Sequence, residues 1–387
     1  MEVALQNCKD YNIDNVYDAV KAAVASLGGM EKFVFKNQTV LIKVNLLSKH
    51  APEDAVTTHP AVVRAIAKLC LEAGAKVIIG DSPGGPFTKI FVNGVYKGCG
   101  MTDVVDEFAD LGLDCSLNQN FDSAVVFFKD AVAAKKMPFI DVALKADIII
   151  NAAKLKTHGF TGYTGCVKNL FGLIAGLQKV QMHGNNTDLY KFCDHLVDIE
   201  RFVKDKCKLH IMDAVVGMEG EGPSAGNPRF IGKIIASVSP YAADIVENVI
   251  MNNNPYSMPV IKNAVDRKII TNNLKDIVIL GENLEKSVII DYNTIKPNFR
   301  GNNAIIKSKF LQKFAFSLLT SRPKILRKCK GCKICFEHCP PKAITMAKSK
   351  AKINYAQCIR CFCCQELCPY KKIKIKKPIA YRLLKFK

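Results

Sequence analysis

Apolar positions in the first 300 residues follow two patterns, helical spacing and short β-branched runs. Residues 1–35 predict a helical lead-in, because four apolar residues recur there at helical spacing. Residues 39–45 and 76–80 are apolar runs short enough to be buried strands, and the helix between them opens at Pro60 and ends at Gly74. A strand, a helix and a strand at this spacing predict a right-handed parallel crossover.

The same alternation continues along the chain. We predict helices over 101–111, 166–176 and 240–252, and strands over 124–129, 146–151, 209–216, 232–238 and 276–280. The sequence therefore predicts an α/β domain over residues 1–300, with a mostly parallel sheet of about six or seven strands flanked by helices.

Polar residues follow the predicted strand over 76–80. Asp81 and Ser82 come directly after it, and ligands of parallel sheets bind just beyond the carboxyl ends of the strands. We expect Asp81 to orient a lysine or to hold a metal. A capping Asp-Ser turn is the structural alternative.

A basic, glycine-rich loop is predicted after the strand over 146–151. It carries Lys154, Lys156, His158 and three glycines, and it leads into the helix that bears Lys168. Such a loop exposes unpaired amides that can hold an anion. We expect His158 to donate a proton near neutral pH, and Lys156 and Lys168 to stabilise charge on an anionic small molecule. A solvated basic loop is the alternative, since surface lysines are common.

Acidic residues follow the strand over 209–216. Asp213, Glu219 and Glu221 are candidates for metal binding or acid–base chemistry, although acidic turn residues are usually only solvated. The basic loop and Asp81 should line one cleft. Four histidines without supporting neighbours are interpreted as structural or surface residues: His50, His183, His195 and His210.

The last quarter of the chain repeats one cysteine spacing. The pattern C-x2-C-x2-C-x3-C-P occurs twice, offset by 29 residues, at Cys329, Cys332, Cys335 and Cys339 and at Cys358, Cys361, Cys364 and Cys368. Three thiolates at this spacing converge on one cube, which indicates two 4Fe-4S clusters of the bacterial ferredoxin kind. Zinc would need four thiolates in one tetrahedron, and disulfides are rare without an export signal. Cys363 lies off the spacing and is interpreted as a bystander thiol.

The resemblance to two-cluster ferredoxins implies crossed ligation, since the fourth cysteine of each run there ligates the other cluster. The implied ligand sets are Cys329, Cys332, Cys335 and Cys368 for one cluster, and Cys358, Cys361, Cys364 and Cys339 for the other. Residues 325–370 would then form a small α+β ferredoxin-like domain whose isoleucines shield the clusters.

Charge is concentrated in the same part of the chain. Residues 301–387 hold 22 Lys and Arg against 2 Asp and Glu, so the net charge of +20 belongs to them. We predict an amphipathic basic linker helix over 301–324 and a basic tail over 371–387. A field of this sign steers association with an acidic redox partner protein. A membrane surface is the next candidate partner, and nucleic acid is unlikely for want of a recognised module.

The chain shows no targeting signal. No run approaches the ~20 apolar residues needed to span a bilayer, and the first residues lack the basic and apolar blocks of a signal peptide. We therefore expect a cytoplasmic protein. Sixteen cysteines then imply reduced thiols and metal ligands, as in an anaerobic or strongly reducing cell.

Six short motifs resemble the family called domain of unknown function 362. They are Lys43-Val-Asn45, Thr57-Thr-His-Pro60, Gly80-Asp-Ser-Pro83, Lys154-Leu-Lys-Thr-His158, Lys168-Asn169 with Gly172, and Asp213 with Gly217-Met-Glu-Gly220. The resemblance covers roughly residues 38–250, implies an appended ferredoxin-like domain in many members, and supplies no substrate. We hypothesise electron delivery to an anionic small molecule. The alternatives are an electron carrier or relay without substrate chemistry, and a binding module for nucleic acid or lipid.

Overall fold

Nine strands form the central sheet of the computed structural model, which describes residues 1–185, 188–296 and 321–376. They are β1 (Glu2–Asn7), β2 (Thr39–Lys43), β3 (Lys76–Gly80), β4 (Cys115–Leu117), β7 (Ile148–His158), β8 (Gly162–Tyr163), β9 (Cys207–Glu219), β10 (Asn227–Ser237) and β11 (Val278–Gly281). The order is β11-β1-β10-β9-β7-β2-β3-β4, and β8 pairs with β7.

Most neighbours in this sheet are parallel. β2 pairs in parallel with β3 and β7, as do β3 with β4, β7 with β9 and β1 with β11. β10 is antiparallel to both β1 and β9, and β8 is antiparallel to β7. The predicted class, an α/β domain with a mostly parallel sheet flanked by helices, is confirmed.

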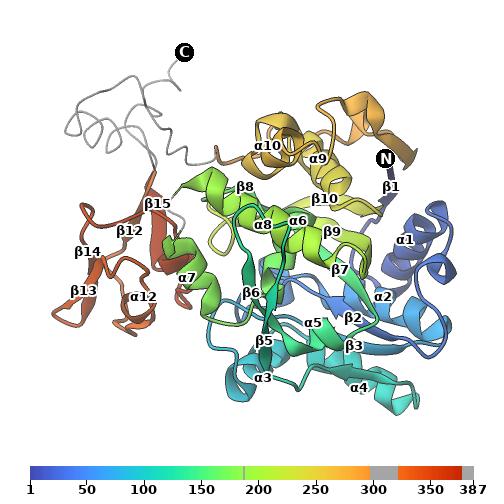
Figure 1. Ribbon diagram of the computed structural model, residues 1–387, viewed down its shortest axis with the longest axis horizontal. Coiled ribbons are helices and arrows are strands. Elements are labelled where there is room, and N and C mark those ends of the chain that lie inside the picture. Colours follow the sequence, from blue (N-terminus) through green and yellow to red (C-terminus); the bar gives the residue numbers. More distant parts are fainter. Residues whose placement is uncertain (186–187, 297–320, 377–387) are drawn as a thin grey trace.

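Helices cover both faces of the sheet (Figure 1). The α-helices are α1 (Ile13–Ser26), α2 (Pro60–Glu72), α3 (Lys89–Gly98), α4 (Met101–Asp110), α5 (Asp141–Lys145), α6 (Gly165–Asn169), α7 (Gln178–Asn185), α8 (Leu189–Val203), α9 (Pro240–Ile250) and α10 (Pro259–Asp266). Short 3-10 helices are η1 (Met30–Lys32), η2 (Pro52–Asp54), η3 (Leu170–Leu173), η4 (Pro255–Ser257), η5 (Leu274–Asp276) and η6 (Glu285–Ser287).

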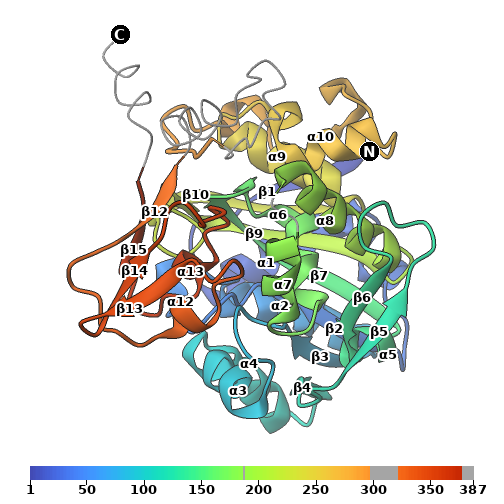
Figure 2. The same cartoon turned by 60° about the vertical axis from the view of Figure 1, so that its left-hand side comes forward.

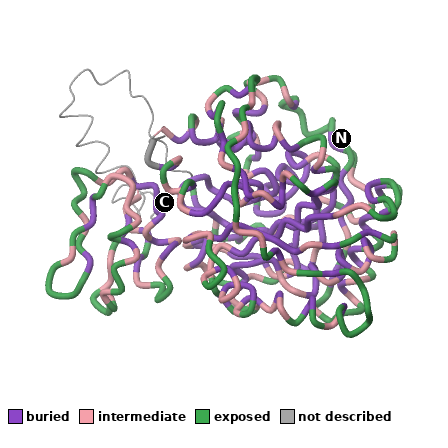
Figure 3. Tube along the Cα trace, turned by 60° about the horizontal axis from the view of Figure 1, so that its bottom comes forward, coloured by how far each residue is buried: buried purple, intermediate pink, exposed green. Residues whose placement is uncertain are grey.

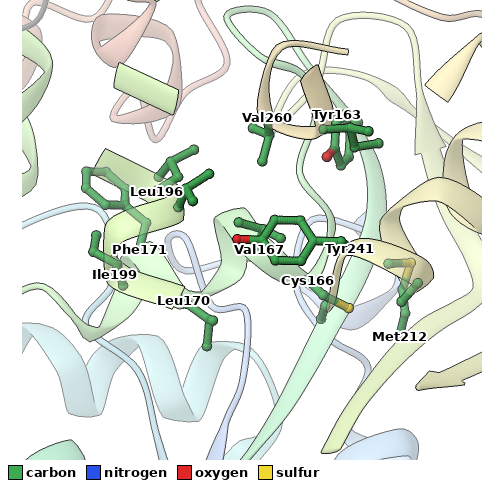
Figure 4. Close-up of a cluster of buried hydrophobic side chains, with 14 of the residues drawn as sticks. Tyr163, Cys166, Val167, Leu170, Phe171, Leu196, Ile199, Met212, Tyr241 and Val260 are labelled. Atoms are coloured by element: carbon green, nitrogen blue, oxygen red, sulfur yellow. The ribbon is translucent and has the colours of Figure 1, made fainter. Parts of the chain in front are cut away.

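Two hydrophobic cores lie on opposite faces of the sheet. Val40 and Ile42 of β2 belong to the core under α1, α2 and α4, whereas Leu41 belongs to the core under α8, α9 and α10. Figure 4 shows part of the second core, where Tyr241 of α9 lies near Cys166 and Leu196 of α8 lies near Phe171. Because successive side chains of a strand point to opposite faces, a strand covered on both sides is a continuous apolar run. In the burial view the centre of the large domain is buried and its rim is exposed (Figure 3).

Four expected elements differ from the structure. Residues 1–35 contain a strand, β1, before the expected helix. The strand expected over 124–129 is β5 (Ser123–Phe127), which pairs only with β6 (Lys136–Ile140) in a separate sheet. The helix expected over 166–176 is broken into α6 and η3. Residues 154–158, which we expected in a loop, extend β7.

The ferredoxin-like unit is a structural repeat as well as a sequence repeat. Its elements are β12 (Arg322–Ile325), α12 (Ile334–Glu337), β13 (Ile344–Ala347), β14 (Lys350–Ile353), α13 (Cys363–Glu366) and β15 (Ile373–Lys376). Left-handed backbone at Gly331, Lys333 and Lys342 recurs 29 residues later, at Arg360, Phe362 and Lys371. β13 pairs with β14 and β15 with β12, so the two halves interlock in the small α+β domain that we predicted.

This unit packs against the sheet domain. Phe362 and Ile375 join the core under α8 to α10, and α13 lies beside α7 (Figures 1 and 2). Most of the predicted linker helix and of the basic tail lies outside the described residues, and the end of the predicted helix is instead the strand β12. Among the described residues, no helix is both long and apolar enough to cross a bilayer.

Candidate functional site

A cavity opens where β2 and β3 end, between η3, α7 and the ferredoxin-like unit. Residues from all of these elements line it: Lys43, Asn45, Leu47, Asp81, Ser82, Gly84, Gly85, Thr164, Lys168, Asn169, Phe171, Gly172, Gly176, Lys179, Val180, His183, Cys363, Glu366 and Leu367. The space for the centres of water-sized molecules is about 90 Å³, enough for several waters or one small ligand. The cavity therefore lies at the carboxyl edge of the sheet, where ligands of such folds bind.

A buried ion pair forms the floor of the cavity. Lys43 Nζ lies 2.8 Å from Asp81 Oδ1, and both side chains are almost fully buried. Burial lowers the pKa of Lys43, and the carboxylate of Asp81 opposes that shift. Asp81 also accepts a hydrogen bond from the backbone N–H of Leu46 at 2.8 Å. Asp81 therefore orients a lysine, as we expected, and the lysine is Lys43 of the neighbouring strand.

Because Gly172 has no side chain, the ion pair of Lys43 and Asp81 can occupy the space beside it. A Cβ at Gly172 would lie 2.1 Å from Asp81 Oδ1 and 2.6 Å from Lys43 Nζ. We expect Gly172→Ala to lower the free energy of unfolding by about 1–3 kcal/mol, because a side chain must displace a buried ion pair. The measurement is denaturant unfolding of the anaerobic protein.

The matched control for that variant is Gly94→Ala in α3. A Cβ at Gly94 has no neighbour within 4 Å, and alanine is the better helix former by roughly 0.8–1.0 kcal/mol. Gly94→Ala should therefore be neutral or stabilising. Equal effects of the two substitutions would contradict the role assigned to Gly172.

Lys179 is fixed beside Asp81 by Ser82. Its ammonium donates to Ser82 O at 2.9 Å, Ser82 Oγ at 2.7 Å and Ile174 O at 2.8 Å, which uses all three of its hydrogens. Burial lowers the pKa of Lys179 to about 7. Ser82 is thus part of the cavity wall, as predicted, and holds Lys179 there.

Lys168 differs from the other lysines of the wall. It is partly exposed to the cavity, and within the described residues its ammonium has neither a hydrogen bond nor an ion pair. Burial lowers the pKa of Lys168, and the charge of Glu366 opposes that shift. The predicted Lys168 and Asp81 therefore meet in one cavity, and Lys168 is the cation free to meet an anion.

Lys156 and His158 lie behind the wall, although we expected them to line the cleft. Both are on β7, whose residues are buried on both faces. Lys156 Nζ donates to Asn45 Oδ1 at 2.8 Å and Val56 O at 2.6 Å, and burial lowers its pKa to about 7. Its contact with the cavity is therefore indirect, through Asn45.

His158 faces the ferredoxin-like unit. The backbone N–H groups of Phe160 and Thr161 donate to its Nδ1, so the proton of the neutral ring is on Nε2. Nε2 lies 2.9 Å from Glu366 Oε1, although neither atom has ideal hydrogen-bond geometry. Burial lowers the pKa of His158 to about 4. The ring is neutral at pH 7 and lies against the carboxylate of Glu366.

The charge of Glu366 is retained by its neighbours. Burial alone would raise its pKa, but His158 and Lys168 lower it well below the usual value. Because His158 is itself neutral near pH 7, we attribute the ionised state of Glu366 chiefly to the ammonium of Lys168. α13 thus contributes an anion to a cavity otherwise built by the sheet domain.

A ladder of buried amides fixes the cavity floor. Asn45 Nδ2 donates to Asn169 Oδ1 at 2.9 Å, and Asn169 Nδ2 donates to Asn151 Oδ1 at 2.7 Å. Asn151 Nδ2 lies 3.0 Å from Nδ1 of His210. The ladder sets the orientation of both cavity-lining amides, and His210 has the structural role that we predicted.

The remaining candidates have structural contacts. Lys154 and Asp213 form a fully buried ion pair at 2.7 Å, and Asp213 also accepts from Tyr11 Oη. Glu219 accepts from the backbone N–H of Asn293 at 3.0 Å. The carbonyl oxygen of Glu221 accepts from Gln365 Nε2 at 3.0 Å, which ties α13 to the sheet domain.

The repeated cysteines form two groups in space, and each group contains cysteines from both runs. Burial and then the thiols of Cys368, Cys332 and Cys329 raise the pKa of Cys335 to about 11. Burial also raises the pKa of Cys339. The backbone N–H of Ala343 lowers this pKa, and the thiols of Cys361 and Cys358 raise it further. The fourth cysteine of each run therefore lies near the thiols of the other run.

The surroundings of these thiols suit 4Fe-4S ligation. Backbone N–H groups donate to sulfur at equivalent positions, from Ala343 to Cys339 at 3.2 Å and from Lys372 to Cys368 at 3.3 Å. Four isoleucines pack around the thiols: Ile325, Ile344, Ile353 and Ile373. Apolar shielding and N–H···S bonds are the features that tune such clusters. No three His, Cys, Asp or Glu side chains of the described residues form a single-ion site.

The two runs differ in exposure. Cys332 of the first run is exposed, whereas Cys361 of the second run and its neighbour Cys363 are buried, as is Cys335 of the first run. Cys363, which we took for a bystander, lines the cavity together with Glu366. Cys363 therefore brings the neighbour of the second-run cysteine Cys364 to the cavity, and Cys332 brings the first run to the surface.

Three of the five charged residues of the cavity wall were not predicted as site residues: Lys43, Lys179 and Glu366. Lys43 is inside an apolar strand, and Glu366 is inside the cysteine repeat, so neither stood out as a cavity residue. One signal was available for Glu366: it is one of only 2 acidic residues among 301–387. His183 lines the cavity and stacks on Phe192 at 4.1 Å, whereas the sequence predicts a structural or surface residue there.

Comparisons with known proteins agree with the architecture. The family model "Domain of unknown function (DUF362)" matches residues 40–247, and a 4Fe-4S dicluster domain matches residues 324–369. A thylakoid-associated protein of Synechocystis sp. is 31% identical over 265 residues, which cover 66% of this chain and 76% of that protein.

Two solved structures are also similar. The lactate racemase apoprotein from Thermoanaerobacterium thermosaccharolyticum shares 15% identity with a TM-score of 0.36, covering 61% of this chain and 54% of that one. A protein from Thermotoga maritima shares 14% identity with a TM-score of 0.31, covering 58% and 55%. The chain thus spans about half the length of each.

The family match covers more than half of the chain, from β2 into α9, and the dicluster match covers the repeated cysteines. The protein therefore belongs to the DUF362 family and carries a C-terminal 4Fe-4S dicluster domain.

Proposed function

We propose that this protein is an iron–sulfur redox enzyme that passes electrons to a small anionic substrate bound in the cavity. The observation that supports the proposal best is Lys168, a cation at the cavity wall that no described residue neutralises by an ion pair. An unpaired ammonium in a partly enclosed site binds an anion strongly, because little water competes with it.

The wall formed by α13 supports the redox part of the proposal. Cys363 and Glu366 line the cavity, and Cys364 between them belongs to the second cysteine run. When bound, 4Fe-4S clusters supply electron transfer. We infer that the eight repeated cysteines hold two of them, with the crossed ligand sets given above. A substrate in the cavity would then be next to Cys363, whose neighbour in the chain, Cys364, is a proposed cluster ligand.

The side chains of the cavity take separate roles in this proposal. Lys168 binds the anionic group and stabilises charge that develops on it. Asp81, held by Lys43, contacts the substrate from the floor. Lys156 and His158 are positioning residues, which act through Asn45 and Glu366.

The test is reoxidation of the dithionite-reduced protein by small organic acids under anaerobic conditions. We expect a subset of acids to reoxidise the protein with a saturable dependence on concentration. If every acid is inert, while a redox protein accepts electrons from this chain at an undiminished rate, the protein is an electron relay and the proposal fails.

A basic surface around the first cysteine run is the proposed entry point for electrons. Cys332 is exposed there, as are Arg327, Lys328, Lys330 and Lys333. An acidic redox protein would be steered to this surface by the field of the unit. We propose such a protein as the partner, acting in the cytoplasm.

Charge reversal at this surface should slow electron entry. We expect Lys328→Glu, Lys330→Glu and Lys333→Glu together to slow reduction by an acidic ferredoxin by roughly tenfold at low salt, and little at high salt. The measurement is stopped-flow reduction at several ionic strengths.

Three exposed lysines of the sheet domain serve as the control: Lys9, Lys21 and Lys36. Reversing them changes the net charge equally and should leave the rate near that of the parent. Equal slowing by both triple variants would show that net charge, and not this surface, guides the partner. Unchanged reduction together with lost binding to anionic vesicles would favour a membrane surface instead.

A further inference from the structure

The cavity wall contains polar atoms that the protein does not satisfy. Thr164 Oγ1 and His183 Nδ1 are buried and have no hydrogen-bond partner among the described residues. Only 3% of Thr164 and 4% of His183 are exposed, and both line the cavity. Buried polar groups nearly always have a partner, so orphans gathered at one cavity indicate a bound molecule or water.

Among the described residues, two carboxylate oxygens of the same cavity wall have no hydrogen-bond donor with suitable geometry. Asp81 Oδ1 lies near Lys43, and Glu366 Oε1 lies near His158, yet neither oxygen makes a hydrogen bond in the described structure. An anion without a donor of its own would face these carboxylates unfavourably. A hydroxyl or amino group on the ligand would donate to one of them.

Size and charge limit the ligand further. The cavity has room for only a few heavy atoms, and Lys168, the only lysine of its lining with neither an ion pair nor a hydrogen bond within the described residues, calls for one negative charge. We therefore infer that the ligand is a small carboxylate that also carries a hydroxyl or amino group. This inference rests on the proposed function in that it takes the cavity for the substrate site.

Calorimetric titration of the anaerobic, oxidised full chain tests this ligand class. Glycolate and acetate are matched probes, since they share the carboxylate and differ by one hydroxyl. We expect glycolate to bind at least roughly tenfold more tightly than acetate, because a site built around a hydroxyl rejects the analogue that lacks it. Lys168→Met should abolish binding of both acids, and Thr164→Val, which keeps the shape, should weaken it.

Three results would overturn the inference. Acetate could bind as tightly as glycolate, inorganic phosphate could bind more tightly than either acid, or neither acid could bind at millimolar concentration. The titration involves no electron donor, so its outcome is independent of redox turnover. Glycolate binding by a protein whose reduced form no acid reoxidises would count against the proposed function alone.

Discussion

Cys368→Ser should remove one cluster, and the cluster lost should be the one held by the first cysteine run. The parent purified without oxygen is expected to contain about eight iron atoms, and the variant about four. The reason is the crossed arrangement, in which Cys335 lies near Cys368 as well as near Cys332 and Cys329. Iron and sulfide analysis with electron paramagnetic resonance of the reduced protein measures the loss.

Double substitutions assign the loss to a run. Adding Cys332→Ser to Cys368→Ser should cost no further iron, whereas adding Cys361→Ser should remove both clusters. The reverse pattern would show that Cys368 serves its own run. Cys363→Ser is the control and should keep all of the iron, because Cys363 faces the cavity and lies off the repeated spacing.

Lys168→Met should keep both clusters and lose turnover. We expect the rate of reoxidation by a small acid to fall by roughly 10²–10³, the range found when one donor to a developing charge is removed. The substitution removes no hydrogen bond or ion pair among the described residues, but it removes the charge that keeps Glu366 ionised, so we expect the pKa of Glu366 to rise while the fold is kept.

Two companion variants sharpen this test. Lys168→Arg keeps the charge and should recover part of the rate, whereas Lys36→Met on the exposed surface should have no effect. A parental rate in Lys168→Met would remove the main support for an anionic substrate. Loss of iron from the same variant would instead indicate a structural role at the domain interface.

Local patterns predicted much of the fold. The runs over 39–45 and 76–80 became β2 and β3, and Gly74 ends α2 in the left-handed region as expected. These elements are specified by residues close together in sequence. The cysteine repeat likewise contains all of its information within 40 positions, and both its spacing and its left-handed turns recur at the same offset.

Long-range partners explain most of what was missed. Lys154, Lys156 and His158 look like a solvated loop, yet they lie on a buried strand. Distant residues contact their polar groups: Asp213 pairs with Lys154, Asn45 and Val56 accept from Lys156, and Glu366 lies beside His158. A buried charge is tolerated only when it is paired, and no local pattern shows a partner on another strand or domain. The sequence therefore predicted where the cavity lies, at the carboxyl edge of the sheet. It did not predict all of the lining residues, because some of them come from distant strands and from the other domain.

β1 has a consequence for synthesis on the ribosome. It lies between β10 and β11, so it is made first but receives its neighbours only when residues 227–281 have followed. At about 5–20 residues per second, that interval is roughly 15–55 s. Val3, Ala4 and Leu5, which have no exposure in the finished sheet, lack both neighbouring strands for most of it. The nascent chain therefore presents an early apolar segment that trigger-type chaperones are suited to shield until the sheet closes around it.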